Sequence, residues 1–201
     1  MNNNVYITSD LHFHHKNIIR YSNRPFDSIE EMNQAMIDQW NSKVNDDDDI
    51  IFVGDLFFCN MTKAKEILDQ LKGNIHVVWG NHDDVLRISK KQIKMGYRPV
   101  KKEFEPYFTS HQDYLELNYK DHMFVISHFP MLSWHQQHRG SIMLHGHCHG
   151  SLPNDETKLI MDVGIDNTSF KIWNLDEIIT IMDLRKEEID RKKLTLTVDH
   201  H

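Results

Sequence analysis

Aspartate, histidine and asparagine residues, which can act as metal ligands, recur in short runs along the sequence. The runs are Asp10-Leu11-His12, Gly54-Asp55, Gly80-Asn81-His82-Asp83, His128 and His145-Gly146-His147-Cys148-His149. Their carboxylate, amide and imidazole groups suit divalent transition metals such as Mn, Fe, Co, Ni or Zn. Cys148 stands between two histidines, and on extended backbone we expect it to point away from them and to pack in the protein.

Each run follows a short apolar segment rich in β-branched residues, which is typical of a strand. These predicted strands cover residues 5–7, 50–53, 75–79, 123–126 and 142–144. Side chains that follow the carboxyl ends of parallel strands meet at one edge of an open sheet, where such sheets build their sites. In Asp10-Leu11-His12, residues i and i+2 would share one face of an extended chain. We therefore expect the runs to converge.

Helices and further strands are predicted around these segments. A capping sequence at residues 27–31 precedes a helical apolar periodicity that reaches residue 44, and Thr62 could cap a second helix that ends before Gly73. The order strand, helix, strand in this part of the chain predicts parallel pairing. The remaining predictions are a helix over residues 85–95, a hairpin that turns at residues 120–121, strands at 159–163 and 170–172, and a helix from a capping box at 174–177 to residue 186.

The order D-x-H, G-D, G-N-H-D, H and G-H-x-H resembles the calcineurin-like metallophosphoesterase superfamily, in its compact single-domain bacterial and phage form. The resemblance extends from Asp10 to His149 and rests on five ordered motifs, each after a predicted strand. It implies an α/β fold, namely a four-layer α/β/β/α sandwich of two mixed sheets flanked by helices, with metals at the strand ends.

The resemblance also implies how two divalent metal ions would be held, with manganese favoured. One ion would take Asp10, His12, Asp55 and His149, and the other would take Asp55, Asn81, His128 and His147, so that Asp55 bridges them. The two carboxylates neutralise only part of the metal charge, which leaves attraction for a phosphate and a bridging hydroxide. His82 would be the catalytic general acid that protonates the leaving alkoxide.

Basic residues follow the first run, and they could bind substrate phosphate through charge-assisted hydrogen bonds. They are His14, His15, Lys16, Arg20 and Arg24, with a solvated loop as the alternative interpretation. His15 and Arg20, together with Asn81, are the candidate substrate contacts. Residues 131–140 include Trp134, His135, His138 and Arg139, and this loop could either shape the substrate pocket or be merely structural.

The residues after Gly54-Asp55 limit the substrate class. They read Leu56-Phe57-Phe58-Cys59 and depart from the Asp-Arg-Gly run of protein Ser/Thr phosphatases in this superfamily, which argues against a phosphoprotein phosphatase. The chain is similar in size to members that hydrolyse phosphodiesters. We therefore expect a phosphodiesterase for a small phosphodiester or nucleotide, with a nucleic-acid end as a further candidate. The alternatives are a phosphomonoesterase and a non-catalytic metal-binding scaffold.

Composition excludes several other classes of protein. A formal net charge of −7 over 201 residues argues against binding of nucleic acid through a basic surface. No apolar stretch is long enough to span a membrane, the first residues lack signal-peptide features, and two cysteines are too few for a disulfide framework. We expect one cytoplasmic domain over residues 1–198 with no membrane partner, and residues 199–201 as a tag remnant. The oligomeric state is left open.

Overall fold

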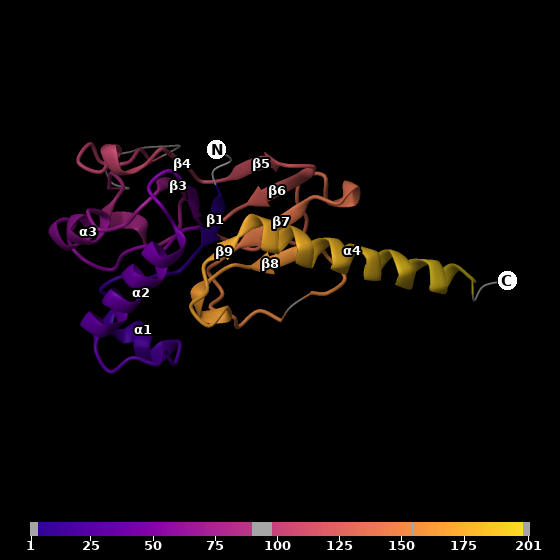
Figure 1. Cartoon of the computed structure of the whole chain (residues 1–201), viewed down its shortest axis with the longest axis horizontal. Coiled ribbons are helices and arrows are strands. Elements are labelled where there is room, and N and C mark those ends of the chain that lie inside the picture. The colour runs from indigo at the N-terminus through magenta and orange to yellow at the C-terminus, as the bar shows by residue number, and fades with distance from the viewer. Residues whose placement is uncertain (1–3, 90–97, 154, 199–201) are drawn as a thin grey trace.

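A computed structural model of the protein describes residues 4–89, 98–153 and 155–198. Two mixed sheets pack face to face and helices flank them, which confirms the expected α/β architecture (Figure 1). The elements in chain order are β1 (Val5–Thr8), α1 (Lys16–Tyr21), α2 (Ile29–Lys43), β2 (Asp49–Phe52), α3 (Met61–Leu68), β3 (Asn74–Val78), β4 (Ser110–Gln112), β5 (Leu115–Tyr119), β6 (His122–Ile126), β7 (Ile142–His145), β8 (Ile160–Asp162), β9 (Trp173–Asn174) and α4 (Leu175–Val198).

The first sheet has the strand order β4-β3-β2-β1-β9. Strands β1 to β4 are parallel, as the strand–helix–strand order predicts, and β9 runs antiparallel to β1. Thr8 pairs with Phe52 and Phe52 with Val77, so the carboxyl ends of β1, β2 and β3 are level. Helices α1 to α3 lie on the face away from the second sheet, where Trp40 is fully buried (Figure 1).

The second sheet has the order β5-β6-β7-β8. The predicted hairpin β5–β6 is confirmed, and β6, β7 and β8 are parallel. Alternate residues of β6 face opposite ways, so that Phe124 and Ile126 pack against the first sheet while Val125 packs against Trp134 of the following loop. The apolar layer between the sheets therefore fixes the position of one set of strand ends relative to the other.

Helix α4 begins at the capping box that the sequence predicts. The backbone N–H of Asp176 donates to Asn174 Oδ1, and the backbone N–H of Asn174 donates to Glu177 Oε2. Ile178 and Met182 bury one side of the helix in the core between the sheets. The helix continues to Val198, beyond its predicted end, and its last turns extend past the strands (Figure 1).

Other local predictions differ from the structure. The helix expected over residues 85–95 is wrong in its described part. A short 3-10 helix ends at Val85, and Arg87 then pairs with Val100 in an antiparallel bridge. Residues 90–95 of that prediction lie outside the described residues. Asn60, rather than Thr62, caps α3 by accepting the backbone N–H of Lys63. The strand expected at residues 170–172 lies instead at Trp173–Asn174. Within the described ranges, no helix combines the length and the apolar composition needed to cross a membrane.

Candidate metal centre

The loops that follow five strands meet above the level strand ends. Backbone hydrogen bonds join them: the N–H of Asp10 donates to Gly54 O at 3.1 Å, and the N–H of Gly146 donates to His128 O at 3.1 Å. The N–H of His12 also donates to Asp55 O, at 3.0 Å. The loop after β1 is thus bonded directly to the loop after β2, and the loop after β6 to the loop after β7.

Two clusters of ligand-type side chains result from this convergence. Their members are Asp10, His12 and His149 in the first cluster and Asp55, His128 and His147 in the second, and within each cluster the ligand atoms lie within 4.8 Å of one another. Asp55 Oδ2 lies 3.7 Å from His12 Nε2 and 3.5 Å from His128 Nε2, between the clusters. Asn81 Oδ1 is 3.1 Å from His128 Nε2 and so borders the second cluster.

The backbone that presents these side chains is left-handed rather than extended. Its φ angles are 60° at Asp10, 51° at His12, 62° at Asp55, 71° at His147 and 47° at His149. The i, i+2 argument for an extended chain therefore predicted the right neighbours for the wrong reason, since β1 ends at Thr8. Left-handed backbone is rare for residues other than glycine and gathers at functional sites, where surrounding structure stabilises it. The half-buried Cys148 likewise lies on a tight turn instead of an extended segment.

Two glycines allow the loops to approach the carboxylates. A Cβ atom on Gly80 would overlap the Asp55 carboxylate, and one on Gly146 would overlap the Asp10 carboxylate and the Ser9 hydroxyl. The absence of a side chain at these positions is what lets backbone pass so close to the ligand groups.

Several buried polar atoms of the first cluster have no hydrogen-bond partner. Among the described residues, these atoms include both ring nitrogens of His12 and Asp10 Oδ1. An unpaired buried polar group is costly, and native proteins satisfy nearly all of them. A divalent cation coordinated by these atoms would remove that cost. The residues present therefore fit a metal ion.

The protonation states of the two clusters also fit a bound cation. Burial lowers the pKa of His12 to about 3, so its ring is neutral and has a free electron pair. Burial by itself would raise the pKa of the Asp55 carboxyl, but its hydrogen bond and charge interaction with His128 lower that pKa to about 2. Burial raises the pKa of Asp10 to about 6 despite the opposing charges of His128 and His149. At neutral pH both aspartates can therefore supply negative charge.

Hydrogen bonds at Nδ1 orient two of the candidate ligand histidines, His128 and His149. His128 Nδ1 lies 2.8 Å from Val53 O, and since a carbonyl only accepts, Nδ1 carries the hydrogen and Nε2 is left for the cluster. His149 Nδ1 lies 2.6 Å from Asp166 Oδ2. Arg24 donates two hydrogen bonds to the same carboxylate, from Nε at 2.8 Å and from Nη2 at 2.9 Å. This arrangement is the carboxylate–histidine pairing that orients metal ligands in other proteins.

Asp166 is missing from the sequence prediction, although the signal that found the other residues applies to it. It follows β8 in Gly164-Ile165-Asp166, at the same kind of strand end. Arg24 was assigned to a cluster that could bind phosphate, and this interpretation is wrong. Its side chain is fully buried and also donates to the carbonyls of Asp10 and Leu11, so it supports the loop from inside the protein.

The other predicted residues lie at different distances from the clusters. The exposed His82 donates its backbone N–H to Asp55 Oδ1 at 2.7 Å, and its ring centre is 5.7 Å from that of His12. The ring of His15 is 5.3 Å from that of His12. Arg20 is exposed and lies over the ring of Tyr21. His82 and His15 thus border the first cluster, whereas Arg20 lies on the surface beside them.

Asp83, the last residue of the Gly80-Asn81-His82-Asp83 run, bonds to backbone N–H groups. Its buried carboxylate accepts the backbone N–H groups of Asp55, Leu56 and Gly80 at 2.7 to 3.1 Å. It therefore holds two ligand loops together. Trp134 of the loop at residues 131–140 is buried against the outer face of the second sheet and donates to Ser141 O, which favours the structural interpretation of that loop.

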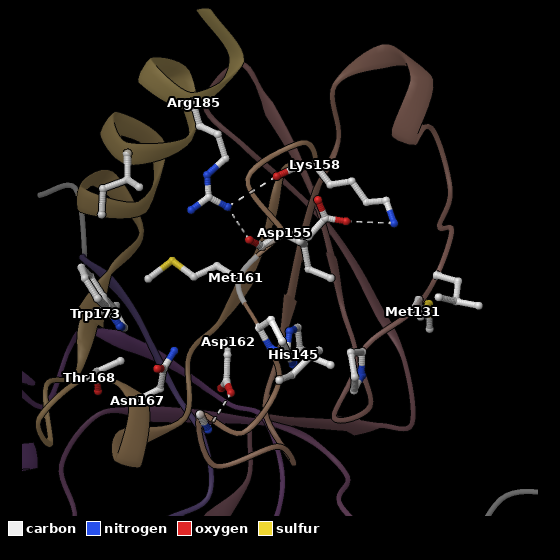
Figure 2. Close-up of a pocket in the computed structure, with 17 residues that line it drawn as sticks. Met131, His145, Asp155, Lys158, Met161, Asp162, Asn167, Thr168, Trp173 and Arg185 are labelled. Carbon is white, nitrogen blue, oxygen red and sulfur yellow. Dashed lines mark hydrogen bonds and ion pairs between the residues drawn. The ribbon is translucent and has the colours of Figure 1, made fainter. Parts of the chain in front are cut away.

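A cavity of about 660 Å³ lies beside the loop after β7, between β8 and α4 (Figure 2). Its walls include Met161, Trp173 and Arg185, and Arg185 donates to the carbonyl of Ile160 on the edge strand β8. None of the side chains predicted for the site is part of its lining. Asp162, on its floor, accepts the backbone N–H of Gly150 next to His149. Asp162 therefore links this cavity to the loop that carries His149, while the cavity itself is separate from the candidate ligand clusters.

Comparison with known proteins identifies a family and several similar proteins. Residues 4–164 match the family model described as the calcineurin-like phosphoesterase superfamily domain. An uncharacterized protein of Methanocaldococcus jannaschii is 32% identical over 190 residues, which cover 90% of this chain and 93% of that protein. The gene 66 protein of Mycobacterium phage L5 is 28% identical over 207 residues, covering 92% and 97%. The crystal structure of a protein of unknown function from Aquifex aeolicus shares the fold, with a TM-score of 0.63 at 18% identity over 90% of this chain and all of that one.

Proposed function

Because the chain belongs to the calcineurin-like phosphoesterase superfamily, we propose that it is a metal-dependent phosphodiesterase acting on a small phosphodiester or nucleotide. The observation that carries the proposal is the position of Asp55 between two clusters of ligand atoms, each suited to one divalent ion. Buried, unpaired atoms of His12 and Asp10 support it, because they need a cation.

In this proposal Asp10, His12, Asp55 and His149 hold one ion, and Asp55, Asn81, His128 and His147 hold the other. When bound, two such ions would neutralise phosphate charge and lower the pKa of a coordinated water, and manganese is the favoured metal. Oxygen and imidazole ligands are equally compatible with Fe, Zn, Co or Ni.

His82 supplies the acid chemistry of the proposed reaction. Its side chain is exposed at the rim of the first cluster, and its backbone is tied to Asp55. In hydrolysis the oxygen of water forms a new bond to phosphorus, and the bond from phosphorus to the leaving oxygen breaks. The leaving oxygen keeps the electron pair and takes a proton from the His82 ring, while the proton lost by the water passes to solvent.

The first test is turnover of bis-p-nitrophenyl phosphate and p-nitrophenyl phosphate with added manganese. We expect the diester to be the better substrate, the variant Asp55→Ala to lose both bound metal and activity, and His82→Ala to keep its metal while kcat falls by about 10²- to 10⁴-fold. His135→Ala is the control, because His135 is an exposed histidine paired with Glu116 outside the clusters.

Each outcome of this test has a distinct meaning. Preference for the monoester would replace the diester proposal with a phosphomonoesterase. Folded, metal-loaded protein that hydrolyses neither ester would favour a binding scaffold. Full activity of His82→Ala would keep the metal centre but remove His82 from the chemistry.

A further inference from the structure

Two exposed phenylalanines border the ligand clusters on different sides. Phe58 is 50% exposed and lies beside the first cluster, where its ring centre is 4.2 Å from that of His15 and 5.7 Å from that of His82. Phe129 is 48% exposed and lies beside the second cluster, 4.6 Å from the ring centre of His147 and 5.1 Å from that of His128. Exposed aromatic rings that border a site are candidates for ligand contact.

The contacts of Phe58 leave part of its ring surface accessible to a ligand. His15 stacks on it with 22° between the ring planes, and His82 meets it at 65°, closer to an edge contact. Half of Phe58 remains exposed with His15 in place, so part of its ring surface is open to a ligand. A groove of about 360 Å³, lined by Phe57, Phe58, Cys59, His82, Asp84 and Val85, begins at this point. Its volume falls within the range of small-molecule sites.

Phe129 is placed differently but borders the other cluster in a comparable way. Its ring meets the rings of His147 and His128 at 61° and 79°, so both imidazoles contact it at an edge-to-face angle. Neither ligand histidine stacks flat against it. A group attached to a phosphate at the clusters could therefore reach Phe58 on the side of His82 or Phe129 on the side of His147.

Phosphodiester chemistry distinguishes these two sides. The leaving oxygen must lie near the general acid, so the leaving substituent lies toward His82 and Phe58. The retained substituent then has the other side, toward Phe129. We infer that the substrate is a diester between two nucleosides, with the base of the leaving nucleoside stacked on Phe58 and the base of the retained one on Phe129. Every base has a flat π-face, so such stacking does not require a particular sequence.

This inference rests on the proposed function and specifies its substrate class. The test compares a dinucleoside monophosphate with glycerophosphocholine, a diester that carries no ring, using the manganese-loaded protein. Phe58→Leu and Phe129→Leu keep an apolar side chain but remove the ring. Tyr114→Leu is the control, because Tyr114 is exposed and paired with Glu116 on the edge strand side of the molecule.

We expect each phenylalanine variant to raise KM for the dinucleoside monophosphate by about 5- to 150-fold, the range for loss of one stacked base. KM for glycerophosphocholine and the metal content should be unchanged. Equal changes for the two diesters, or no change for either, would overturn the stacking role. Failure of the wild type to hydrolyse any diester would instead count against the proposed function.

A binding measurement tests the same idea without turnover. We expect calorimetry to show tighter binding of a nucleoside monophosphate than of inorganic phosphate by the metal-loaded wild type. The double variant Phe58→Leu/Phe129→Leu should lose that difference and keep its affinity for inorganic phosphate. An undiminished preference for the nucleotide in the double variant would contradict the inference.

Discussion

The carboxylate of Asp166 lies 2.6 Å from Nδ1 of His149 and directs the opposite ring nitrogen, Nε2, toward Asp10 at 3.8 Å. The pair connects the loop after β8 with the loop after β7. Because the carboxylate accepts the Nδ1 hydrogen, Nε2 keeps the electron pair that a metal requires. Arg24 holds the carboxylate in turn and neutralises its charge inside the protein.

The variant Asp166→Asn should therefore weaken metal binding. An amide restrains the imidazole less strongly than a carboxylate, and loss of such a partner lowers metal affinity by about 10- to 100-fold in other proteins. Calorimetric titration with manganese would measure this. Asp183→Asn is the matched control, because it changes an aspartate that also pairs with a histidine, His122, but on the surface. Equal affinity of Asp166→Asn and wild type would contradict the orienting role.

Removal of Arg24 should destabilise the fold itself. Its side chain is fully buried and bonds Asp166 and the carbonyls of Asp10 and Leu11, so Arg24→Gln leaves a buried carboxylate without its counter-ion. We expect a loss of about 3–5 kcal/mol in the free energy of unfolding, measured with urea on metal-free protein. Lys158→Ala, which breaks a partly exposed pair with Asp155, should cost about 1 kcal/mol or less. Similar losses of unfolding free energy for Arg24→Gln and Lys158→Ala would contradict the stabilising role of the buried Arg24.

Metal binding should stabilise the protein because it satisfies the buried atoms of His12 and Asp10. At a manganese concentration 100 times the dissociation constant, binding to the folded state alone adds about 2.7 kcal/mol to the free energy of unfolding. Thermal unfolding with and without manganese would show the gain as a higher Tm, and a chelator should reverse it. Asp55→Asn should lose most of the gain, since Asp55 lies between both clusters. An equal gain in this variant would place the metal elsewhere.

Metal affinity should rise with pH. Burial would lower the pKa of His128, but its hydrogen bond to Asp55 and the charges of Asp55 and Asp10 raise it to about 9. The metal-free His128 therefore carries a proton at neutral pH, and a metal must displace that proton. Between about pH 6.5 and pH 9 we expect affinity to increase by up to about tenfold per pH unit for this proton.

Calorimetry at pH 7 in buffers of different ionisation enthalpy would count the protons released. His149, whose pKa is also raised by its bond to Asp166 against the effect of burial, should add to the release. His122→Gln, a surface change, is the control for histidines outside the site. Metal binding that releases no proton and has the same affinity throughout this range would contradict the prediction.

The local pattern of the sequence was sufficient for much of the architecture and for the convergence of the candidate ligand residues. Apolar β-branched runs predict β1, β2, β3, β6 and β7 because strands buried on both faces need such residues. Polar residues at their carboxyl ends predict convergence, and Asp10, Asp55 and His128 do lie close together in the structure. The expected single sheet edge is wrong, because β1 and β2 belong to the first sheet and β6 to the second, so the ends of two sheets meet at the site. The strands and the convergence depend on short segments and on a simple rule of sheet geometry, so the sequence alone could predict them.

Features that depend on contacts between distant segments could not be predicted in this way. The left-handed backbone at Asp10 and His147 is stable only because neighbouring loops bond to it, so an extended-chain argument could not predict it. Arg24 was assigned a role by residue type, whereas its burial gives it the carbonyls of Asp10 and Leu11 as partners. Asp166 follows a strand as the other site residues do, but its pairing with His149 is visible only in the folded structure. Residue type and spacing thus determine which groups are available, and packing determines which of them meet.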